Sequence, residues 1–159
     1  MPEKRVKDSQ ITLNQLMLPE DANHMGNVHG GVVMKLVDNT GGLCAMRHAQ
    51  HQVVTVAIDS MTFYSPVHVG DVLTLNASLN WVGRSSMEVG VRVVAENPLT
   101  GECTHTNTAF LVYVALDDKG QPIEVPPLIL ETDEERRRWA DAELRQKRRL
   151  ERRRMKDKA

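Results

Sequence analysis

The residues of this 159-residue chain that could do chemistry gather in one stretch, NVHGGVVMKLVD, which runs from Asn27 to Asp38. Its pair Gly30 and Gly31 stands where a polar loop meets an apolar run. Glycines at a helix N-terminus present backbone N–H groups without an obstructing side chain, at the end where the helix dipole favours negative charge. Such a site could stabilise the oxyanion of an acyl-transfer reaction. The same two glycines could also simply form a tight turn.

Asp38 follows Gly31 by seven residues, which is two helical turns, and lies close to the apolar face of the expected helix. A carboxylate there is costly to bury without a partner or a task. Such an acid could deprotonate a water molecule or act as a nucleophile. A capped or solvated acid is the alternative that the sequence leaves open.

A helix is predicted from Gly31 to about Arg47, because apolar residues recur there at spacings of three and four. Gly41 and Gly42 lie inside it, and each should destabilise the helix by about 1 kcal/mol relative to alanine. We therefore expect another element to approach the helix backbone closely at this point.

Strand patterns surround this helix and predict an antiparallel sheet. Within 72–82, Leu73, Leu75 and Leu79 alternate with Thr74 and Asn80, the period of a half-buried strand. The expected elements are a strand-like lead-in over 11–19, four long hairpin-connected strands over 53–66, 72–82, 86–97 and 102–116, a proline-rich extended segment over 122–130, and a long helix over 131–159 that begins behind a Thr132 cap. The chain should thus be an α+β protein with its first helix against one face of the sheet.

Several motifs together resemble one family, the hotdog-fold acyl-CoA thioesterases of the cytosolic acyl-CoA hydrolase branch. They are LMLPEDANHMGNVHGGVVMKLVDNTGG, SPVHVGD, SSMEVGVRV and NPLTGECTHTNTAFLVYVALDDKG, and the likeness runs from about residue 11 to about residue 143. The resemblance implies a thioesterase domain over 1–130 whose long central helix is wrapped by an antiparallel sheet, and a charged helical extension over 131–159. It also implies that the chain hydrolyses fatty acyl-CoA without a cofactor, as a homo-oligomer built from hotdog dimers, in the family's usual form a trimer of dimers.

The resemblance also implies roles for individual residues. Asp38 would be the general base or nucleophile, either activating water directly or forming a covalent anhydride. Asn27 would position the water or the thioester carbonyl, and Gly31 with Gly30 would form the oxyanion hole. Because the asparagine and the acid of one site come from different hotdog units in this family, Asn27 of one protomer should face Asp38 of its neighbour.

Two further sets of residues are candidates for substrate binding. Arg84, Ser85 and Ser86 match the region that receives coenzyme A in the family, where an arginine can pair with phosphate and serines can hydrogen-bond the pantetheine arm. A polar turn between two strands is the alternative. His29 is expected to contact substrate or to support the loop, and no cluster of residues with metal-ligand spacing is evident.

Composition narrows the competing functions. Residues 136–159 carry twelve Lys or Arg against four Asp or Glu, a net charge of +8, whereas the whole chain has a net charge of −1. We expect this segment to be a solvated helix face. Nucleic acid is not expected as a partner, because the chain has only two Phe, two Tyr and two Trp to stack on bases.

Cys44 and Cys103 are expected to be free thiols. Because the chain has no long apolar run, it should be cytoplasmic with no membrane partner.

The strongest rival function is an acyl-CoA sensor that does not turn its ligand over and that uses the basic tail to contact nucleic acid or a protein. Asp38 argues against a sensor, which has no use for an acid at that position. A dehydratase is the third possibility, and it would need an essential histidine.

Overall fold

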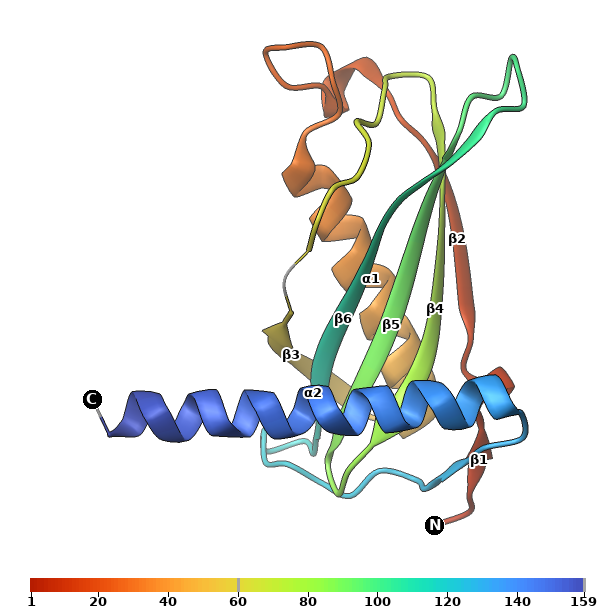
Figure 1. The fold of residues 1–159 in the computed structure, drawn as a ribbon. Coiled ribbons are helices and arrows are strands. Elements are labelled where there is room, and N and C mark those ends of the chain that lie inside the picture. The colour runs from red at the N-terminus through yellow and green to blue at the C-terminus, as the bar shows by residue number, and fades with distance from the viewer. Residues whose placement is uncertain (60, 159) are drawn as a thin grey trace.

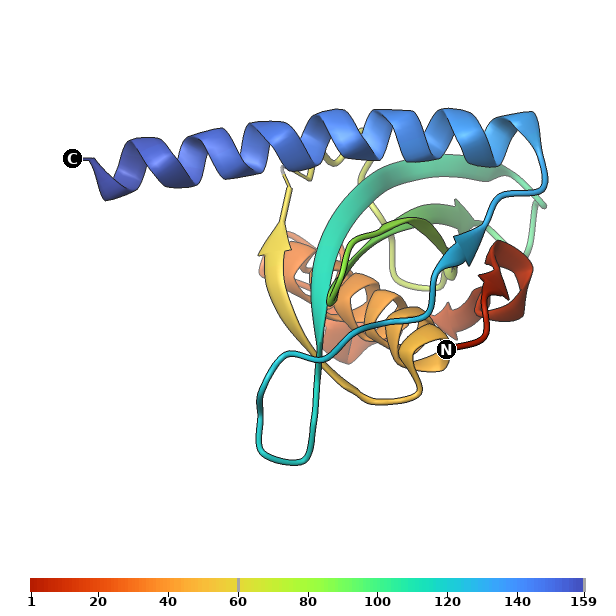
Figure 2. The ribbon, with the colours of Figure 1, turned by 90° about the horizontal axis from the view of Figure 1, so that it is seen from below.

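The computed structural model describes residues 1–59 and 61–158 and contains a five-stranded antiparallel sheet that curls around one long helix (Figures 1 and 2). The elements are β1 (Lys4–Arg5), β2 (Ile11–Leu16), α1 (Gly30–Ala49), β3 (Gln52–Ile58), β4 (Val72–Val82), β5 (Ser86–Glu96), β6 (Cys103–Leu116), β7 (Leu128–Ile129) and α2 (Asp133–Asp157), with 3₁₀ turns at Val6–Asp8 and Pro19–Asp21. The predicted α+β arrangement with a central helix and a C-terminal helix is confirmed. None of the helices in the described ranges has the length and apolar content needed to cross a bilayer.

The order of the strands corrects one prediction. The sheet runs β2-β4-β5-β6-β3, so β3 pairs with β6 and is not joined to β4 by a hairpin. Because the sheet wraps α1, the strand before the helix takes one edge and the strand after it takes the other. β3 also ends at Ile58, so residues 59 and 61–66 of the expected 53–66 strand lie outside any strand, and Ser60 lies outside the described residues.

The concave face of the sheet forms the core with α1. Leu73, Leu75 and Leu79 of β4 are almost fully buried, as their alternation predicts, and so are Val37 and Cys44 of α1. Their burial against one another supplies the hydrophobic free energy that holds the helix inside the sheet. The proline-rich segment 122–130 is extended as expected, except that Leu128 and Ile129 form β7 against β1, a short parallel pair that the sequence did not indicate.

The outer face of the sheet carries α2, which crosses the strands and continues beyond the edge formed by β3 (Figure 2). Thr132 caps this helix as predicted, because its hydroxyl accepts a hydrogen bond from the Glu135 N–H at 3.1 Å. The expectation of a solvated basic face is wrong for Arg145 and Arg149, since both bind Glu88, a carboxylate of β5 that is 0% exposed. The helix therefore docks through a buried ion network that sequence reasoning did not foresee.

Candidate active site

The Asp38 carboxylate lies on the third turn of α1, half-buried and held by two hydroxyl groups. Its Oδ1 atom accepts hydrogen bonds from Thr55 Oγ1 of β3 at 2.8 Å and from the Tyr113 hydroxyl of β6 at 3.1 Å. No hydrogen bond to Oδ2 is found among the described residues. One oxygen of this acid is thus fixed, and the other stays open to a reaction partner.

Tyr113 ties the acid to the sheet. Its ring is 1% exposed, and its hydroxyl also lies 3.0 Å from the backbone carbonyl oxygen of Asp38. Burial, and then the negative charge of Asp38, raise the pKa of the Tyr113 hydroxyl above its usual value of 10.0. The phenol therefore keeps its proton and serves as a hydrogen-bond donor.

The close approach predicted at the helix glycines is made by the same tyrosine. A Cβ placed on Gly41 would lie 2.5 Å from the Tyr113 hydroxyl oxygen, nearer than real Cβ contacts come. The absence of a side chain at Gly41 thus lets the Tyr113 hydroxyl reach Asp38. At Gly42 a Cβ would meet the Tyr113 ring at an ordinary 3.7 Å, so this second glycine is not required by the contact.

A hollow of about 520 Å³ opens beside Asp38. Apolar side chains of β2, α1 and β3 form much of its lining, and Asp38, Thr55 and Tyr113 are among its polar members. A mostly apolar recess with a few convergent polar groups is the usual form of a small-molecule site.

The first two residues of α1, Gly30 and Gly31, are the glycines of the expected oxyanion hole. The Gly31 N–H donates to His29 Nδ1 at 3.0 Å, so His29 is the N-cap of α1. No acceptor for the Gly30 N–H is found in the part of the chain that the structure describes. Of the two predicted donors, Gly30 is therefore free, whereas Gly31 would have to exchange His29 for an oxyanion.

The loop before α1 is organised by Asn23 and not by Asn27. Asn23 Oδ1 accepts hydrogen bonds from the N–H groups of Met25 at 2.9 Å and of Asn27 at 3.2 Å. Asn27 is half-buried, and its backbone bridges to His68. The helix rises about 12 Å between Gly30 and Asp38. Within 1–59 and 61–158, no hydrogen bond joins Asn27 to Asp38 in the single chain.

The turn between β4 and β5 lies at the opposite end of the sheet from the N-terminus of α1 (Figure 1). It contains Arg84 and Ser85, with Ser86 as the first residue of β5, and Arg84 forms an exposed ion pair with Glu124 at 3.3 Å. Backbone bonds fix the turn, because the Arg84 carbonyl accepts from the Val125 N–H at 2.9 Å. One chain does not bring this predicted substrate-binding set to the loop asparagine.

The structure therefore orients the Asp38 carboxylate. Within one chain it keeps three predicted groups apart from this acid, namely Asn27, the Gly30–Gly31 pair and the turn of Arg84 to Ser86. Thr55 and Tyr113 were missed from the sequence, where only their inward positions in strand patterns could have indicated them. No group of three or more His, Cys, Asp or Glu able to hold a metal ion occurs in the residues that the structure describes. The chemistry that this arrangement supports is acid–base or nucleophilic catalysis by Asp38.

Comparison with known proteins defines the class. A curled antiparallel sheet around a central helix is the hotdog fold, and the model of the family described as "Thioesterase superfamily" matches residues 25–102. The Bacillus subtilis protein named uncharacterized acyl-CoA thioester hydrolase YkhA is 38% identical over 135 residues, which are 84% of this chain and 78% of that protein. The rat cytosolic acyl coenzyme A thioester hydrolase is 35% identical over 86% of this chain and 36% of its own length.

Solved structures agree with this assignment. An apo-hexameric acyl-CoA thioesterase superimposes with a TM-score of 0.91 at 42% identity, covering 96% of this chain and 97% of that one. A Staphylococcus aureus acyl-CoA hydrolase in complex with butyryl coenzyme A and coenzyme A gives 0.90 at 34% identity, covering 99% and 96%. That hydrolase has also been solved as variants in which an aspartate, an asparagine or a threonine is replaced by alanine.

The chain belongs to the thioesterase superfamily and, within it, to the acyl-CoA thioester hydrolases. The fold, family and enzyme class predicted from the sequence are confirmed.

Proposed function

We propose that this protein hydrolyses fatty acyl-CoA to a free fatty acid and coenzyme A, with Asp38 as the general base or nucleophile. The observation that carries the proposal is the asymmetric carboxylate, whose Oδ1 is held by Thr55 and Tyr113 while no described residue forms a hydrogen bond to Oδ2. Held in this way, Asp38 does not have to reorient before it acts. The relatives named acyl-CoA thioester hydrolases support acyl-CoA as the substrate.

The reaction needs a nucleophile, an oxyanion donor and a proton for the leaving thiolate. Asp38 Oδ2 either takes a proton from the attacking water or itself attacks the thioester carbonyl. Because about 12 Å of helix separates Gly30 from Asp38 within one chain, the Gly30 N–H that donates to the carbonyl oxygen would come from the neighbouring protomer, joined by that of Gly31 when His29 moves away. In the first route the C–S bond then breaks, and the proton that Asp38 took from water passes to the leaving thiolate of coenzyme A. In the second route C–S cleavage leaves an anhydride on Asp38, the thiolate takes a proton from solvent, and a water then hydrolyses the anhydride to the free acid and Asp38.

The loop asparagine has two candidates. Asn27 is the residue expected from the motif, and it remains a prediction. In the S. aureus hydrolase, the replaced asparagine stands fifteen residues before the replaced aspartate and the replaced threonine seventeen after it. Counted from Asp38, the same spacings fall on Asn23 and Thr55, and Thr55 does bond Asp38. Asn23 is therefore the second candidate to position water or the thioester carbonyl.

A second copy of the chain would complete the site. β3 is an edge strand, and its Val54, Val56 and Ile58 are each more than 40% exposed, as are Met34 and Leu43 of α1. An open strand edge beside exposed apolar side chains favours association. We propose that this edge meets its counterpart in a hotdog dimer, which brings the asparagine loop of one protomer to the acid of the other.

Three such dimers would form a hexamer, in line with the relatives solved as hexamers. In this assembly the turn of Arg84, Ser85 and Ser86 would serve a site that includes a neighbouring protomer. The cytosolic relatives support a cytoplasmic place of action.

The first test is the release of free coenzyme A from acyl-CoAs of increasing chain length, by the wild type and by Asp38→Asn, Asn27→Ala and Asn23→Ala. We expect Asp38→Asn to lower kcat by about two orders of magnitude or more while the assembly stays intact. The true loop asparagine should show a similar loss, and the other asparagine a much smaller one. Undiminished turnover by Asp38→Asn would refute the mechanism.

The rival sensor makes a different prediction in the same assay, because it binds acyl-CoA and releases no thiol even as the wild type. Mixing Asp38→Asn with the inactive asparagine variant tests the shared site. Subunit exchange should restore part of the activity, since some sites would then combine an intact acid with an intact asparagine. Exchange without recovery would show that each site is built within one protomer.

A further inference from the structure

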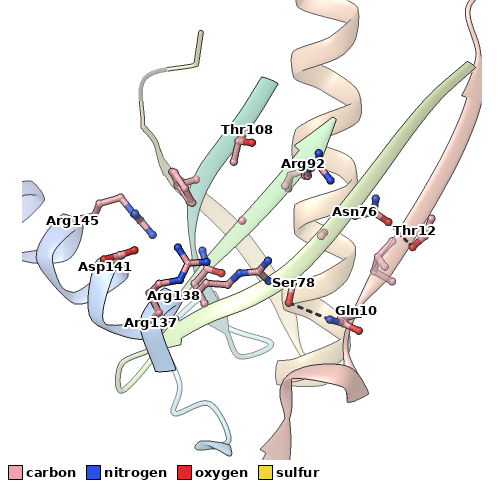
Figure 3. Close-up of a pocket in the computed structure, with 16 residues that line it drawn as sticks. Gln10, Thr12, Asn76, Ser78, Arg92, Thr108, Arg137, Arg138, Asp141 and Arg145 are labelled. Atoms are coloured by element: carbon pink, nitrogen blue, oxygen red, sulfur yellow. Dashed lines mark hydrogen bonds between the residues drawn. The ribbon is translucent and has the colours of Figure 1, made fainter. Parts of the chain in front are cut away.

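A second hollow, of about 550 Å³, lies on the outer face of the sheet, away from Asp38 (Figure 3). The strands β4, β5 and β6 form its floor, α2 forms one wall, and residues from Gln10 to Thr12 form the opposite rim. A Cβ on Gly90 would come within 2.9 Å of Asn80 Nδ2, so a glycine at this position leaves room for the Asn80 side chain in the floor of the hollow. None of its lining residues takes part in the proposed hydrolysis.

The hollow is lined by guanidinium groups from two elements. Arg92 rises from β5, and Arg137 and Arg138 come from the first turns of α2 (Figure 3). Among the described residues no acid lies within ion-pair distance of Arg92. Arg137 and Arg138 share the single carboxylate of Glu134, at 3.7 and 2.8 Å. Positive charge is thus in excess around this cavity, and an anion inside it would relieve the repulsion.

Arg145 also lines the hollow, but its guanidinium group already has partners within the protein. Its guanidinium binds Glu88 at 2.7 Å and covers the Phe110 ring at 3.7 Å from the centroid. Phe110 is the one aromatic residue among those that line the hollow, and the Arg145 guanidinium already occupies one face of its ring. This argues against a flat heterocycle as the occupant.

The remaining polar groups suit hydroxyl groups on a ligand. Thr12, Asn76, Ser78 and Thr108 present small polar side chains to the hollow, and Asp141 is the only acid of its lining. A carboxylate accepts hydrogen bonds from alcohols but repels a phosphate, so Asp141 suits the hydroxylated part of a molecule whose anionic part faces the arginines. Guanidinium groups bind phosphate and carboxylate oxygens through paired N–H donors, and a phosphate monoester has three terminal oxygens, so it can engage more than one guanidinium group at once.

We propose that this hollow binds a small phosphate monoester that carries hydroxyl groups, with Arg92, Arg137 and Arg138 on the phosphate and Asp141 on a hydroxyl. The site lies on the opposite side of the sheet from Asp38, and its existence does not depend on the hydrolytic mechanism.

Calorimetric titration of the intact assembly with glycerol 3-phosphate tests the proposal. Arg92→Gln and Arg137→Gln should each weaken binding by about tenfold or more, because each removes a charged donor to the phosphate. Arg136→Gln is the matched control, since it removes the same charge from the same turn of α2 but lies outside the hollow. Thermal unfolding of each variant checks that the fold is retained.

Two further titrations separate the parts of the ligand. Asp141→Asn should weaken binding of glycerol 3-phosphate but not of inorganic phosphate, because only the ester offers a hydroxyl. Coenzyme A, itself a phosphate monoester, identifies the source of the phosphate. Competition with glycerol 3-phosphate would assign the site to coenzyme A, and independent binding would assign it to a separate metabolite. No binding of glycerol 3-phosphate at millimolar concentration, or equal weakening by Arg92→Gln and Arg136→Gln, would overturn the proposal.

Discussion

A carboxylate lies against each face of the sheet, half-buried Asp38 of α1 on the concave face and fully buried Glu88 of β5 on the outer face, and the two are held by different means. On the concave face, Asp38 receives two hydrogen bonds from neutral hydroxyl groups, both on Oδ1. On the outer face, Glu88 is bound by the guanidinium groups of Arg145 and Arg149 and by the Asn80 amide. The first acid is oriented, whereas the second is neutralised.

The bonds to the individual oxygens show what this difference means. Glu88 Oε1 accepts from Asn80 and Arg145, and Oε2 accepts from Arg145 and Arg149, so neither oxygen is left for a reaction. Asp38 keeps Oδ2 free. A carboxylate saturated by charged donors serves structure, and one held at a single oxygen by neutral donors remains available for chemistry.

Glu88→Gln tests the structural half of this comparison and should have the largest effect. The substitution leaves Arg145 and Arg149 without their shared buried carboxylate, and breaking such a pair costs about 3–5 kcal/mol. We expect a loss of that order in the free energy of unfolding, measured by denaturant titration, with the docking of α2 weakened.

The same variant should retain turnover per folded molecule, because the hydrogen bonds of Glu88 go to Asn80, Arg145 and Arg149 on the outer face and not to Asp38, Thr55 or Tyr113. Glu134→Gln is the control, since it breaks only exposed ion pairs on α2 and should change stability by less than about 1 kcal/mol. A Glu88→Gln protein as stable as the wild type would contradict a structural role for this acid.

Gly41→Ala should have the second largest effect, because it acts on the concave face through packing. Its Cβ would lie 2.5 Å from the Tyr113 hydroxyl oxygen and 3.3 Å from two ring carbons. Overpacking of this kind destabilises by about 1–3 kcal/mol, and here it should also displace the donor from Asp38 and lower kcat.

A double-mutant cycle with Tyr113→Phe sharpens this prediction. Removing the hydroxyl relieves the closest contact, so Gly41→Ala should cost less stability in the Tyr113→Phe background than in the wild type. Gly42→Ala is the matched control, with a Cβ contact of 3.7 Å. Strictly additive losses would indicate that the alanine strains some other contact.

Local patterns explain which parts of the structure could be predicted from the sequence. The alternation of Leu73, Leu75 and Leu79 defined β4, and the helical spacing defined α1, because both patterns reflect burial on one side of a single element. The strand order could not be inferred in this way. The position of β3 at the edge beside β6 depends on how the sheet closes around α1, and the residue pattern of a single segment does not indicate this closure.

For the active site too, local patterns predicted one residue but not its partners. Asp38 stood out because an acid near an apolar helix face is unusual, and the glycine at 41 indicated a close neighbour. Its partners Thr55 and Tyr113 come from strands 17 and 75 residues away, and nothing local distinguishes them from other inward positions. Glu88 sits in the polar half of an alternating strand, and its burial arises only because α2 covers it.

Thr55→Ala tests the chemical half of the comparison at a single hydrogen bond. It should lower kcat by about tenfold with little change in stability, because Asp38 loses one of the two donors that orient it. Thr55→Ser keeps the hydroxyl and should recover most of the rate, whereas Thr55→Val keeps the shape and should not. Full activity in Thr55→Val would show that the hydroxyl does not position the acid.

The smallest effect concerns Cys44, which is buried in the apolar core behind the Asp38 site. Burial raises the pKa of its thiol from the usual 9.0 to about 12. The unfolded chain therefore releases this proton first, so the stabilisation is complete below pH 9 and is lost progressively between pH 9 and 12. The loss should be about 1 kcal/mol near pH 10.

Unfolding titrations between pH 8 and pH 10 on Cys44→Ala and Cys103→Ala would isolate this contribution. The packing cost of Cys44→Ala is the same at every pH, so the variant should differ from the wild type by a shallower alkaline slope as well as by a constant offset. Cys103 is exposed, so Cys103→Ala is the control that removes a thiol outside the core. Equal slopes in all three proteins would mean that water reaches the Cys44 thiol, and the concave face would then be less dry than the packing around Asp38 implies.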